Sequence, residues 1–259
     1  MKHTPTTELC AHSLTGMNYR DKDLVNDLIG ERTFTDVMFT QIMGRTPRAV
    51  DLRITDAVLI TLMEHGLTPS AIATRLIYMS APENLQGAVS AGILAVGSQF
   101  VGTMENCSQL LSKVLESDNP EQTAMEIAQQ HRSNKQHLPG FGHHLHKPDD
   151  PRSIKLIELA QKETELSQKH VNALLMLGKA VDEVYGKHIT INATGAVAAL
   201  LGEIGIPTEL MRGFAVISRA AGLVSHIAEE QRIPSGRFIW ETIDEAIPYA
   251  SKSTRQETL

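Results

Sequence analysis

Residues 53–63 read RITDAVLITLM, and this stretch decides the class of fold. Gly66 follows soon after and suits the left-handed conformation that ends many helices. Pro69 then suits the first turn of another helix. One helix that ends near Gly66 and a second that begins near Pro69 are therefore expected. The apolar residues of the stretch recur at the spacing that places them on one helix face; they are Ile54, Val58, Leu59, Leu62 and Met63.

The same helical pattern recurs along most of the 259 residues and predicts an all-α protein. The best strand candidate is KHITI at residues 187–191, which is short and rich in β-branched side chains. Small residues gather at 87–102 and 193–199, which indicates either close helix packing or close approach of a ligand to the backbone. Helices are expected over residues 21–30, 35–43, 48–64, 69–79, 83–97, 99–116, 120–133, 151–164, 166–185, 194–204 and 207–231.

The composition argues against several classes of protein. Hydrophobic residues make up 42% of the chain and charged residues 21%, as in ordinary globular proteins. The formal net charge is -6 and basic residues form no run, which argues against nucleic-acid binding. No stretch approaches the roughly 20 apolar residues that a membrane-spanning helix needs, and the first residues lack the apolar core of a signal peptide. With only two cysteines, Cys10 and Cys107, a cytoplasmic protein with reduced thiols is expected.

The stretch that carries chemistry is LPGFGHHLHKPDDPRS, residues 138–153. Its two glycines permit backbone conformations that other residues would strain, and such a loop can present N–H groups to an oxyanion or a phosphate. Asp149 and Asp150 are placed to cap the helix that follows. Arg152, at the start of that helix, is suited to grip a carboxylate with two parallel hydrogen bonds. The loop therefore predicts an anion-binding site.

The histidines of this region leave other interpretations open. His137, His143, His144 and His146 offer imidazole ligands for a metal ion. Adjacent histidines point apart unless the loop bends sharply, so the same residues are also compatible with a solvated loop. Metal analysis of the purified protein separates the two interpretations.

Four parts of the chain resemble the citrate synthase family. Gly140-Phe141-Gly142-His143 followed by Asp150-Pro151-Arg152 resembles its GxGH…DPR signature. Glu64-His65-Gly66 resembles its His-Gly/His-Glu loop, and the segment from Phe214 to His226 resembles its late helix with a substrate arginine. The closing QRIPSGRFIWETIDEAIPY is similar to the citryl-CoA lyase module of ATP-citrate lyase. The resemblance runs from about residue 20 to about residue 248 and implies a citrate synthase-like, all-α fold.

The resemblance also implies how the chain is organised. A large helical domain of residues 1–117 and 193–259 and a small domain of residues 118–192 are expected, with the GFGH…DPR loop in the small one. Domain closure would shield a reactive enolate from water. A homodimer, or a tetramer, is expected, with the site built across the interface. No permanently bound cofactor is expected, because coenzyme A enters as part of the acyl-CoA thioester, beside a small keto acid such as oxaloacetate.

Two histidines receive catalytic roles by resemblance. His65 matches the histidine that hydrogen-bonds the thioester carbonyl and stabilises the enolate, and His143 matches the histidine at the keto or hydroxyl oxygen. Gly140, Phe141 and Gly142 match the loop that meets the adenine and phosphate region of CoA through its backbone.

Arginines supply the carboxylate-binding groups. Arg152 and Arg219 match carboxylate-binding arginines of the family. A further arginine usually arrives from the partner subunit, and Arg237 is the candidate for it, with Arg232 as second choice.

One position departs from the family pattern. The family's catalytic aspartate falls on Asn192 when the small-residue helix is kept in register. A carboxamide does not exchange a proton near neutral pH, and loss of the base costs about 10²–10⁴-fold in rate. Condensation begins by deprotonating carbon, whereas cleavage of a β-hydroxyacyl-CoA needs a base at the hydroxyl, for which His143 is available, and water can protonate the enolate. The sequence therefore favours a citryl-CoA lyase type of enzyme over a synthase; the alternative is a non-catalytic or altered CoA-ester-binding homologue.

Overall fold

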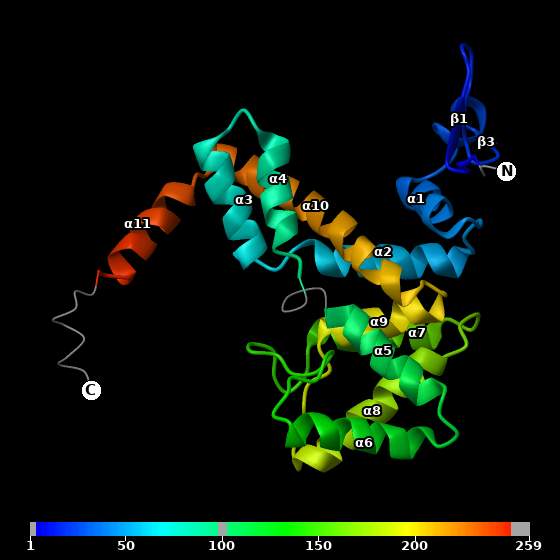
Figure 1. Cartoon of the computed structure of the whole chain (residues 1–259), viewed down its shortest axis with the longest axis vertical. Helices are drawn as coiled ribbons and strands as arrows, with labels where there is room; N and C mark the ends of the chain where they lie inside the picture. The colour runs from blue at the N-terminus through cyan, green and yellow to red at the C-terminus, as the bar shows by residue number, and fades with distance from the viewer. Residues whose placement is uncertain (1–3, 98–102, 250–259) are drawn as a thin grey trace. The chain divides into compact units, whose positions relative to one another are not determined.

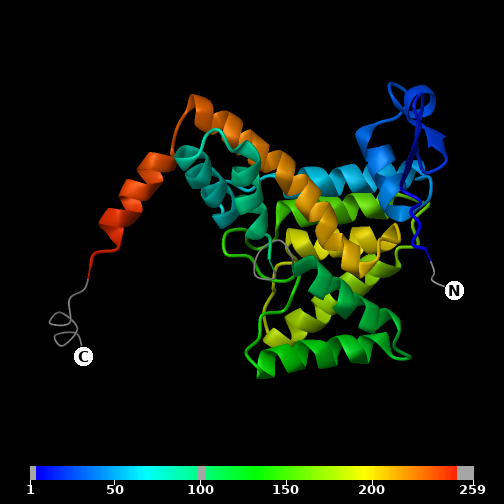
Figure 2. The same ribbon diagram turned by 45° about the horizontal axis from the view of Figure 1, so that its top comes forward.

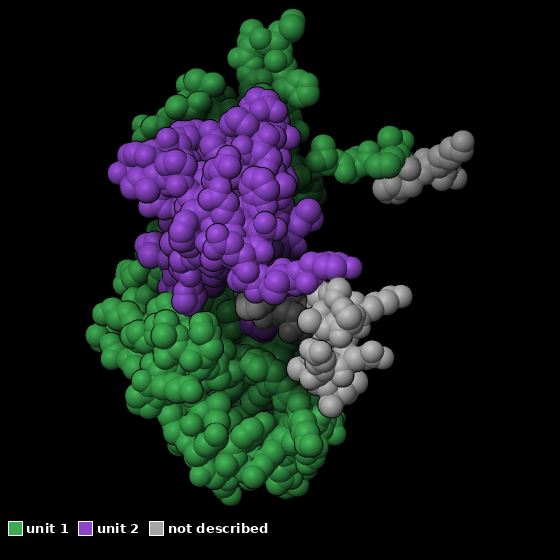
Figure 3. All heavy atoms as spheres, turned by 90° about the vertical axis from the view of Figure 1, so that its left-hand side faces the viewer, with its two compact units in different colours: residues 1–58, 104–211 green, residues 59–103, 212–259 purple. Residues whose placement is uncertain are grey.

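The computed structural model describes residues 4–97 and 103–249. The chain forms two compact units, which Figure 3 colours separately. Unit 1 takes in Met1–Val58 and Met104–Met211, and unit 2 takes in Leu59–Thr103 and Arg212–Leu259. The predicted small domain, residues 118–192, falls wholly within unit 1, and its independence from the rest of that unit stays a prediction.

Unit 1 begins with a small antiparallel sheet and continues with helices (Figure 1). The sheet has the order β1-β2-β3 and is followed by a π-helical turn, η1. The bounds are β1 (Cys10–His12), β2 (Met17–Tyr19), β3 (Lys22–Asp23), η1 (Leu24–Leu28), α1 (Phe34–Met43), the first part of α2 (Ala49–Met63), α5 (Thr103–Leu115), α6 (Pro120–Ser133), α7 (Pro151–Lys162), α8 (Lys169–Tyr185), α9 (Ala193–Glu203) and the first residues of α10 (Thr208–Arg232).

The core of unit 1 is built around α9, whose sequence ATGAVAALLGE is buried at nine of its positions. Helices α7 and α8 both pack against α9, and α6 lies alongside α8, as Figure 2 also shows. Because the first buried residues of α9, Ala193, Gly195 and Ala196, are small, neighbouring backbone can approach the start of this helix closely. This helix therefore supports the loop that precedes α7.

Unit 2 consists of helices alone among its described residues. It contains the end of α2, α3 (Pro69–Ser80), α4 (Leu85–Leu94), the longer part of α10 and α11 (Gly236–Ala246). Helix α3 packs on α4, and α11 contacts α3. A Cβ atom added to Gly92 of α4 would lie 2.1 Å from Thr74 Oγ1 and 2.6 Å from Leu223 Cδ1, so this small residue serves close helix packing.

The all-α fold predicted from the sequence is confirmed, with boundaries within a few residues for most helices. Local turn chemistry explains several starts, since Asn119 and Asp150 cap helices that have proline in the first turn. Parts of the predicted helix 99–116 and of the small-residue segment 87–102 lie outside the described residues.

Three sequence expectations are wrong. The stretch 21–30 forms β3 and η1 instead of an α-helix. The predicted strand at 187–191 forms only an isolated bridge between Ile191 and Phe141. The sequence pattern also failed to predict the amphipathic helix α11. No helix among the described residues is both long enough and apolar enough to cross a lipid bilayer.

Candidate active site

The GFGH…DPR loop of unit 1 is anchored to the chain just before α9. Gly142 N donates to the Thr190 carbonyl at 2.7 Å, and Asn192 N donates to the Gly140 carbonyl at 3.0 Å. Phe141 N donates to the Leu138 carbonyl at 3.2 Å. The N–H groups of Phe141 and Gly142 are thus used inside the protein, so the expectation that the loop presents them to a phosphate is wrong for these two. Contact of residues 140–142 with CoA stays a prediction.

Gly140 and Gly142 both adopt positive φ, +88° and +77°, which explains the two glycines of the motif. A Cβ atom on Gly140 would also lie 2.5 Å from Cys107 Sγ, and one on Gly195 would lie 2.6 Å from the Gly140 carbonyl oxygen. The loop and α9 are therefore in direct backbone contact. Burial raises the pKa of the Cys107 thiol to about 12, so this cysteine stays protonated and packs as an apolar residue.

Asp150 holds Arg152 in a fixed orientation. Its buried carboxylate accepts from Arg152 Nε at 3.0 Å and from Arg152 Nη2 at 2.7 Å, and it caps α7 through the Arg152 N–H at 3.0 Å. A further bond comes from Ala193 N at 3.1 Å, at the start of α9. Burial alone raises the pKa of Asp150, but the Arg152 guanidinium and these N–H groups outweigh it and hold the pKa below its usual range.

Asp149 does not cap α7 beside Asp150, contrary to the sequence expectation. Its carboxylate lies 2.9 Å from Nε2 of His188, whose Nδ1 lies 2.6 Å from Asp182. The two neighbouring carboxylates raise the pKa of His188, while its burial opposes them in part. This cluster ties the loop to the end of α8.

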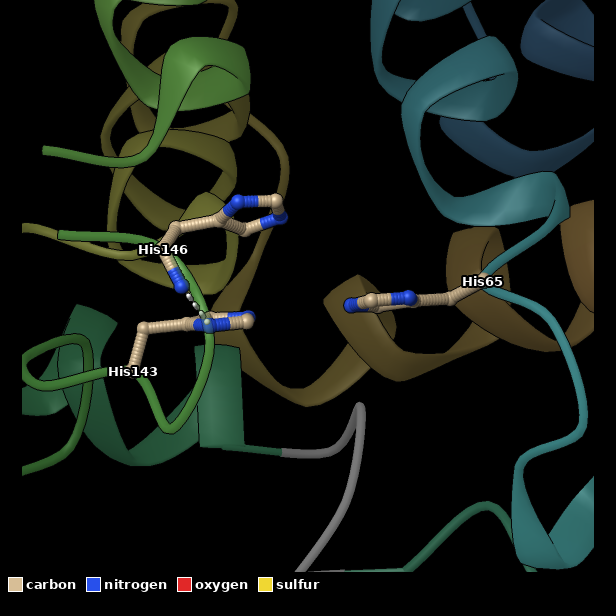
Figure 4. A group of neighbouring side chains, drawn as sticks. All are labelled: His65, His143 and His146. Carbon is tan, nitrogen blue, oxygen red and sulfur yellow. Dashed lines mark hydrogen bonds between the residues drawn. The ribbon is translucent and has the colours of Figure 1, made fainter.

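His143 lies beside Arg152 and is held by its own loop. Its Nδ1 accepts hydrogen bonds from Leu145 N at 3.0 Å and from His146 N at 2.9 Å, the second of which Figure 4 draws. Because Nδ1 accepts, the neutral imidazole carries its proton on Nε2. Arg152 Nη2, which can only donate, lies 3.3 Å from that nitrogen, so in this tautomer the two donors are neighbours and not hydrogen-bond partners. Burial, then the neighbouring His146, lowers the pKa of His143, so the neutral form is favoured.

The loop histidines pack on one another. The ring of His144 stacks on that of His143 with centroids 4.7 Å apart, and the ring of His146 lies 4.5 Å away. Within the described residues of this loop, no three side chains gather their ligand atoms at one point. The Nδ1 of His143 is also engaged with two backbone N–H groups of the loop.

Asn192 is the N-cap of α9. Its Oδ1 accepts from Gly195 N at 3.1 Å and from Thr194 Oγ1 at 2.7 Å, and its Nδ2 donates to the Gly142 carbonyl at 3.0 Å. The carboxamide thus caps a helix and ties it to the GFGH…DPR loop. A carboxamide does not exchange a proton near neutral pH, and any other catalytic role of Asn192 stays a prediction.

His65 belongs to unit 2, where it follows the last residue of α2 by two positions and is exposed. The preceding Glu64 folds back over the turn, and its Oε1 accepts from His65 N at 2.9 Å and from Gly66 N at 2.6 Å. Gly66 has a φ of +71°, as expected for the residue that ends this helix. His65 is drawn in Figure 4 as the side chain on the turn that leaves α2.

Arg219 lies on α10 in unit 2 and is only 3% exposed. Its Nη1 is 3.6 Å from Glu64 Oε2, whereas Nε and Nη1 have no hydrogen-bond partner among the described residues. Burial lowers the pKa of Arg219, and the Glu64 charge opposes that effect. A buried guanidinium with unsatisfied donors is the arrangement expected of a group that awaits an anion.

The remaining arginine candidates lie on the surface. Arg237, on α11, is 75% exposed and pairs with Glu241 at 2.7 Å. Arg232, at the end of α10, is also exposed. A role for either across a subunit interface stays a prediction.

The predicted site residues divide between the two units. Unit 1 brings His143, Arg152 and Asn192 together around one loop, and unit 2 brings His65 and Arg219 together around Glu64. Sequence reasoning missed the partners that hold these groups, Asp150 for Arg152 and Glu64 for Arg219. One sequence signal could have pointed to these partners: each acidic residue lies one or two positions from a predicted site residue.

The chain is similar to several known proteins in sequence and in fold. A model of the family "Citrate synthase, C-terminal domain" matches residues 9–239. The 2-methylcitrate synthase of Shewanella oneidensis is 24% identical over 217 residues, which cover 81% of this chain and 56% of that protein. The probable ATP-citrate synthase subunit 1 of Neurospora crassa is 23% identical over 210 residues, which cover 74% of this chain and 31% of that protein. The chain therefore spans about a third to a little over half of the length of these relatives.

Among solved structures, citryl-CoA lyase from Hydrogenobacter thermophilus superposes with a TM-score of 0.84 and is 28% identical, over 96% of both chains. ATP citrate lyase from Methanothrix soehngenii, solved in complex with citrate and coenzyme A, has a TM-score of 0.79 at 19% identity; the match covers 97% of this chain and 43% of that one. The second likeness concerns the fold alone.

Proposed function

Because this chain belongs to the citrate synthase family, we propose that it cleaves a β-hydroxyacyl-CoA such as citryl-CoA into acetyl-CoA and an α-keto acid such as oxaloacetate, or catalyses the reverse condensation. The observation that carries the proposal is that His143, whose Nδ1 accepts from two backbone N–H groups, lies beside an Arg152 whose orientation Asp150 fixes. A full-length structural likeness to a citryl-CoA lyase supports it. Coenzyme A enters as part of the substrate.

His143 acts at the oxygen of the keto acid or of the β-hydroxy group. Its Nδ1 is occupied by two backbone N–H groups, so Nε2 donates a hydrogen bond instead of taking a proton. In this proposal His143 is an oxyanion donor, and its sequence-based assignment as the base stays a prediction. The same alkoxide forms in cleavage and in condensation, so one donor stabilises the transition state in both directions.

The arginines hold carboxylates, and His65 serves the thioester. Arg152 presents a guanidinium whose orientation Asp150 fixes, and Arg219 presents buried donors without hydrogen-bond partners among the described residues. Both fit the carboxylates of a citryl or oxaloacetyl group. His65 is assigned to the thioester carbonyl, where a donor stabilises the enolate.

Cleavage is the favoured direction. Asn192 is fully engaged as a helix cap and supplies no carboxylate for removing a proton from the acetyl methyl group. In cleavage the hydroxyl proton passes to a water molecule, the carbon–carbon bond of the resulting alkoxide breaks to give the keto acid and the enolate, and water returns a proton to the enolate carbon. The second candidate, a CoA-ester-binding homologue with little turnover, rests on the same observation. A cytoplasmic location and a homodimer or tetramer remain predictions from the sequence.

The experiment is to incubate the purified protein with citryl-CoA and with related β-hydroxyacyl-CoA thioesters and to measure released acetyl-CoA and keto acid. Release above the rate with H143N protein supports the lyase. Absence of release from every thioester, together with a rise in Tm on adding CoA, supports the binding homologue instead. Metal content of the same preparation tests the remaining histidine-ligand interpretation.

A further inference from the structure

In unit 2, the carboxylate of Glu64 lies against four polar groups. Glu64 Oε1 accepts from the N–H groups of His65 and Gly66. Glu64 Oε2 lies 2.9 Å from His226 Nε2 and 3.6 Å from Arg219 Nη1. Two of these four groups, His65 and Arg219, belong to the proposed active site. The carboxylate therefore links the turn that presents His65 with the guanidinium that receives the substrate.

His226 is oriented from its other side by a buried arginine. Arg75 Nε donates to His226 Nδ1 at 3.0 Å, so the neutral imidazole carries its proton on Nε2, the nitrogen that faces Glu64. Arg75 is itself paired with Glu229 and Glu230. Burial lowers the pKa of Arg75, but these carboxylates outweigh it and raise the pKa, so the donor stays charged.

His226 Nε2 and Glu64 Oε2 are close to each other but are poorly aligned for a hydrogen bond. Nε2 does not meet the angular requirement for a hydrogen bond, yet the 2.9 Å separation from Oε2 leaves no room for an intervening water. The His226 ring and the Glu64 carboxylate are therefore in direct contact.

A glycine allows α10 to reach the end of α2. Arg219, Gly222 and His226 recur at a spacing that places them on one face of α10. A Cβ atom on Gly222 would lie 2.0 Å from the Met63 carbonyl oxygen and 3.5 Å from Glu64 Oε2. The helices can approach this closely only because residue 222 has no side chain.

We propose that Glu64 is a positioning residue of the active site, which sets the backbone of His65 and holds Arg219, while the Arg75–His226 pair keeps Glu64 in place. The inference rests on the proposed function for the roles of His65 and Arg219. Glu64 Oε1 bonds to the backbone on each side of the His65 side chain, so its removal releases the turn. Its Oε2 provides the nearest negative charge to Arg219, so its removal leaves that guanidinium without a counter-charge until substrate arrives.

The test uses the full chain with Glu64→Ala and Glu64→Gln. Alanine removes every contact, and kcat/KM for citryl-CoA is expected to fall about 100-fold, the scale of a misplaced catalytic group. Glutamine keeps an oxygen for the two N–H groups but loses the charge beside Arg219, so the expected change is a rise of about tenfold in KM with a smaller fall in kcat. In amide NMR spectra, the His65 and Gly66 signals shift in the alanine variant and stay near their wild-type positions in the glutamine variant.

Glu203→Gln is the matched control, because Glu203 also accepts from two backbone N–H groups, those of His170 and Val171, at the start of a helix. It is expected to lower Tm without changing kcat/KM per folded molecule. Wild-type kinetics in Glu64→Ala together with unmoved His65 and Gly66 signals would overturn the inference. If the wild-type protein cleaves no thioester, the proposed function fails, and the amide signals alone still decide whether Glu64 positions the turn.

Discussion

Asp150 and Arg152 form a two-point ion pair inside a single loop, with the carboxylate fully buried and the guanidinium partly exposed. Both Asp150 oxygens accept from Arg152, and each also bonds to the start of a helix, α7 or α9. The acid therefore both orients Arg152, the proposed substrate-binding group, and joins two helices. Its loss should affect stability and binding together.

Replacing Asp150 with Asn should lower the free energy of unfolding by about 1–3 kcal/mol, because an amide group would face donors in a buried site. Urea unfolding at pH 7 measures this change. Asp149→Asn is the matched control, since that neighbouring carboxylate is 44% exposed and should alter stability by less than about 1 kcal/mol. Equal effects of the two substitutions would contradict the structural account.

The pH dependence of stability should carry the signature of the same residue. The pKa of Asp150 is lower in the folded protein than in the unfolded chain, so the unfolded state takes up its proton first as pH falls. The stabilisation is therefore complete well above about pH 4 and is lost as pH falls through the lowered folded value. Unfolding free energies measured from pH 7 to pH 3 should fall more steeply in wild type than in Asp150→Asn. Parallel pH curves for wild type and Asp150→Asn would contradict the assignment of this pH dependence to Asp150.

Replacing His143 with Asn should lower kcat for thioester cleavage by about 10²–10³-fold, because the Nε2 donor at the developing oxyanion is lost. The lowered pKa of His143 also predicts that wild-type activity persists below about pH 6.5, where an ordinary histidine becomes charged. Below the folded value, protonation of Nδ1 would break both bonds from the loop N–H groups. A pH–rate profile that falls with a midpoint above 6.5 would contradict this assignment, and His144→Asn serves as the control for the stacked ring.

Replacing Asn192 with Asp tests whether this position is the family's catalytic aspartate. The structure predicts that the cap of α9 survives, because aspartate caps as well as asparagine. The bond from Nδ2 to the Gly142 carbonyl is lost and a negative charge faces that oxygen, so stability should fall by about 1–3 kcal/mol. No gain in condensation activity is expected. A large gain in citrate-forming activity would show that the side chain reaches the reacting carbon.

Replacing Gly222 with Ala should destabilise the protein by about 1–3 kcal/mol, because the new methyl group would collide with the Met63 carbonyl. Gly213 lies in the same helix with nothing within 4 Å of an added Cβ. Gly213→Ala should therefore stabilise the protein by about 0.5–1 kcal/mol. Thermal unfolding of the two variants tests this prediction, because Tm should fall in Gly222→Ala and rise in Gly213→Ala.

The errors in the sequence-based fold have physical causes. The stretch 187–191 has β-branched residues but no neighbouring strand to pair with, so it makes one bridge with Phe141 and continues into the cap of α9. Residues 21–30 contain the cap Asp23, which accepts from Val25 N and Asn26 N and starts a π-helical turn instead of an α-helix. The apolar side chains of α11, including Phe238 and Trp240, are exposed. Helix α11 begins at Gly236, beyond the last helix that the sequence predicts, residues 207–231.

By itself, the sequence determined the helical class and the family, and it proposed the residues that carry chemistry, because periodicity and the GFGH…DPR spacing are local properties of the chain. Only the tertiary structure decided what those residues can do. Asp150 and the start of α9 lie far apart in sequence and meet through folding, as do Glu64 and Arg219. The loop conformation turns two backbone N–H groups toward Nδ1 of His143, and these determine which ring nitrogen of the neutral imidazole carries the proton. Protonation and orientation depend on such contacts, and contacts of this kind exist only once the chain is folded.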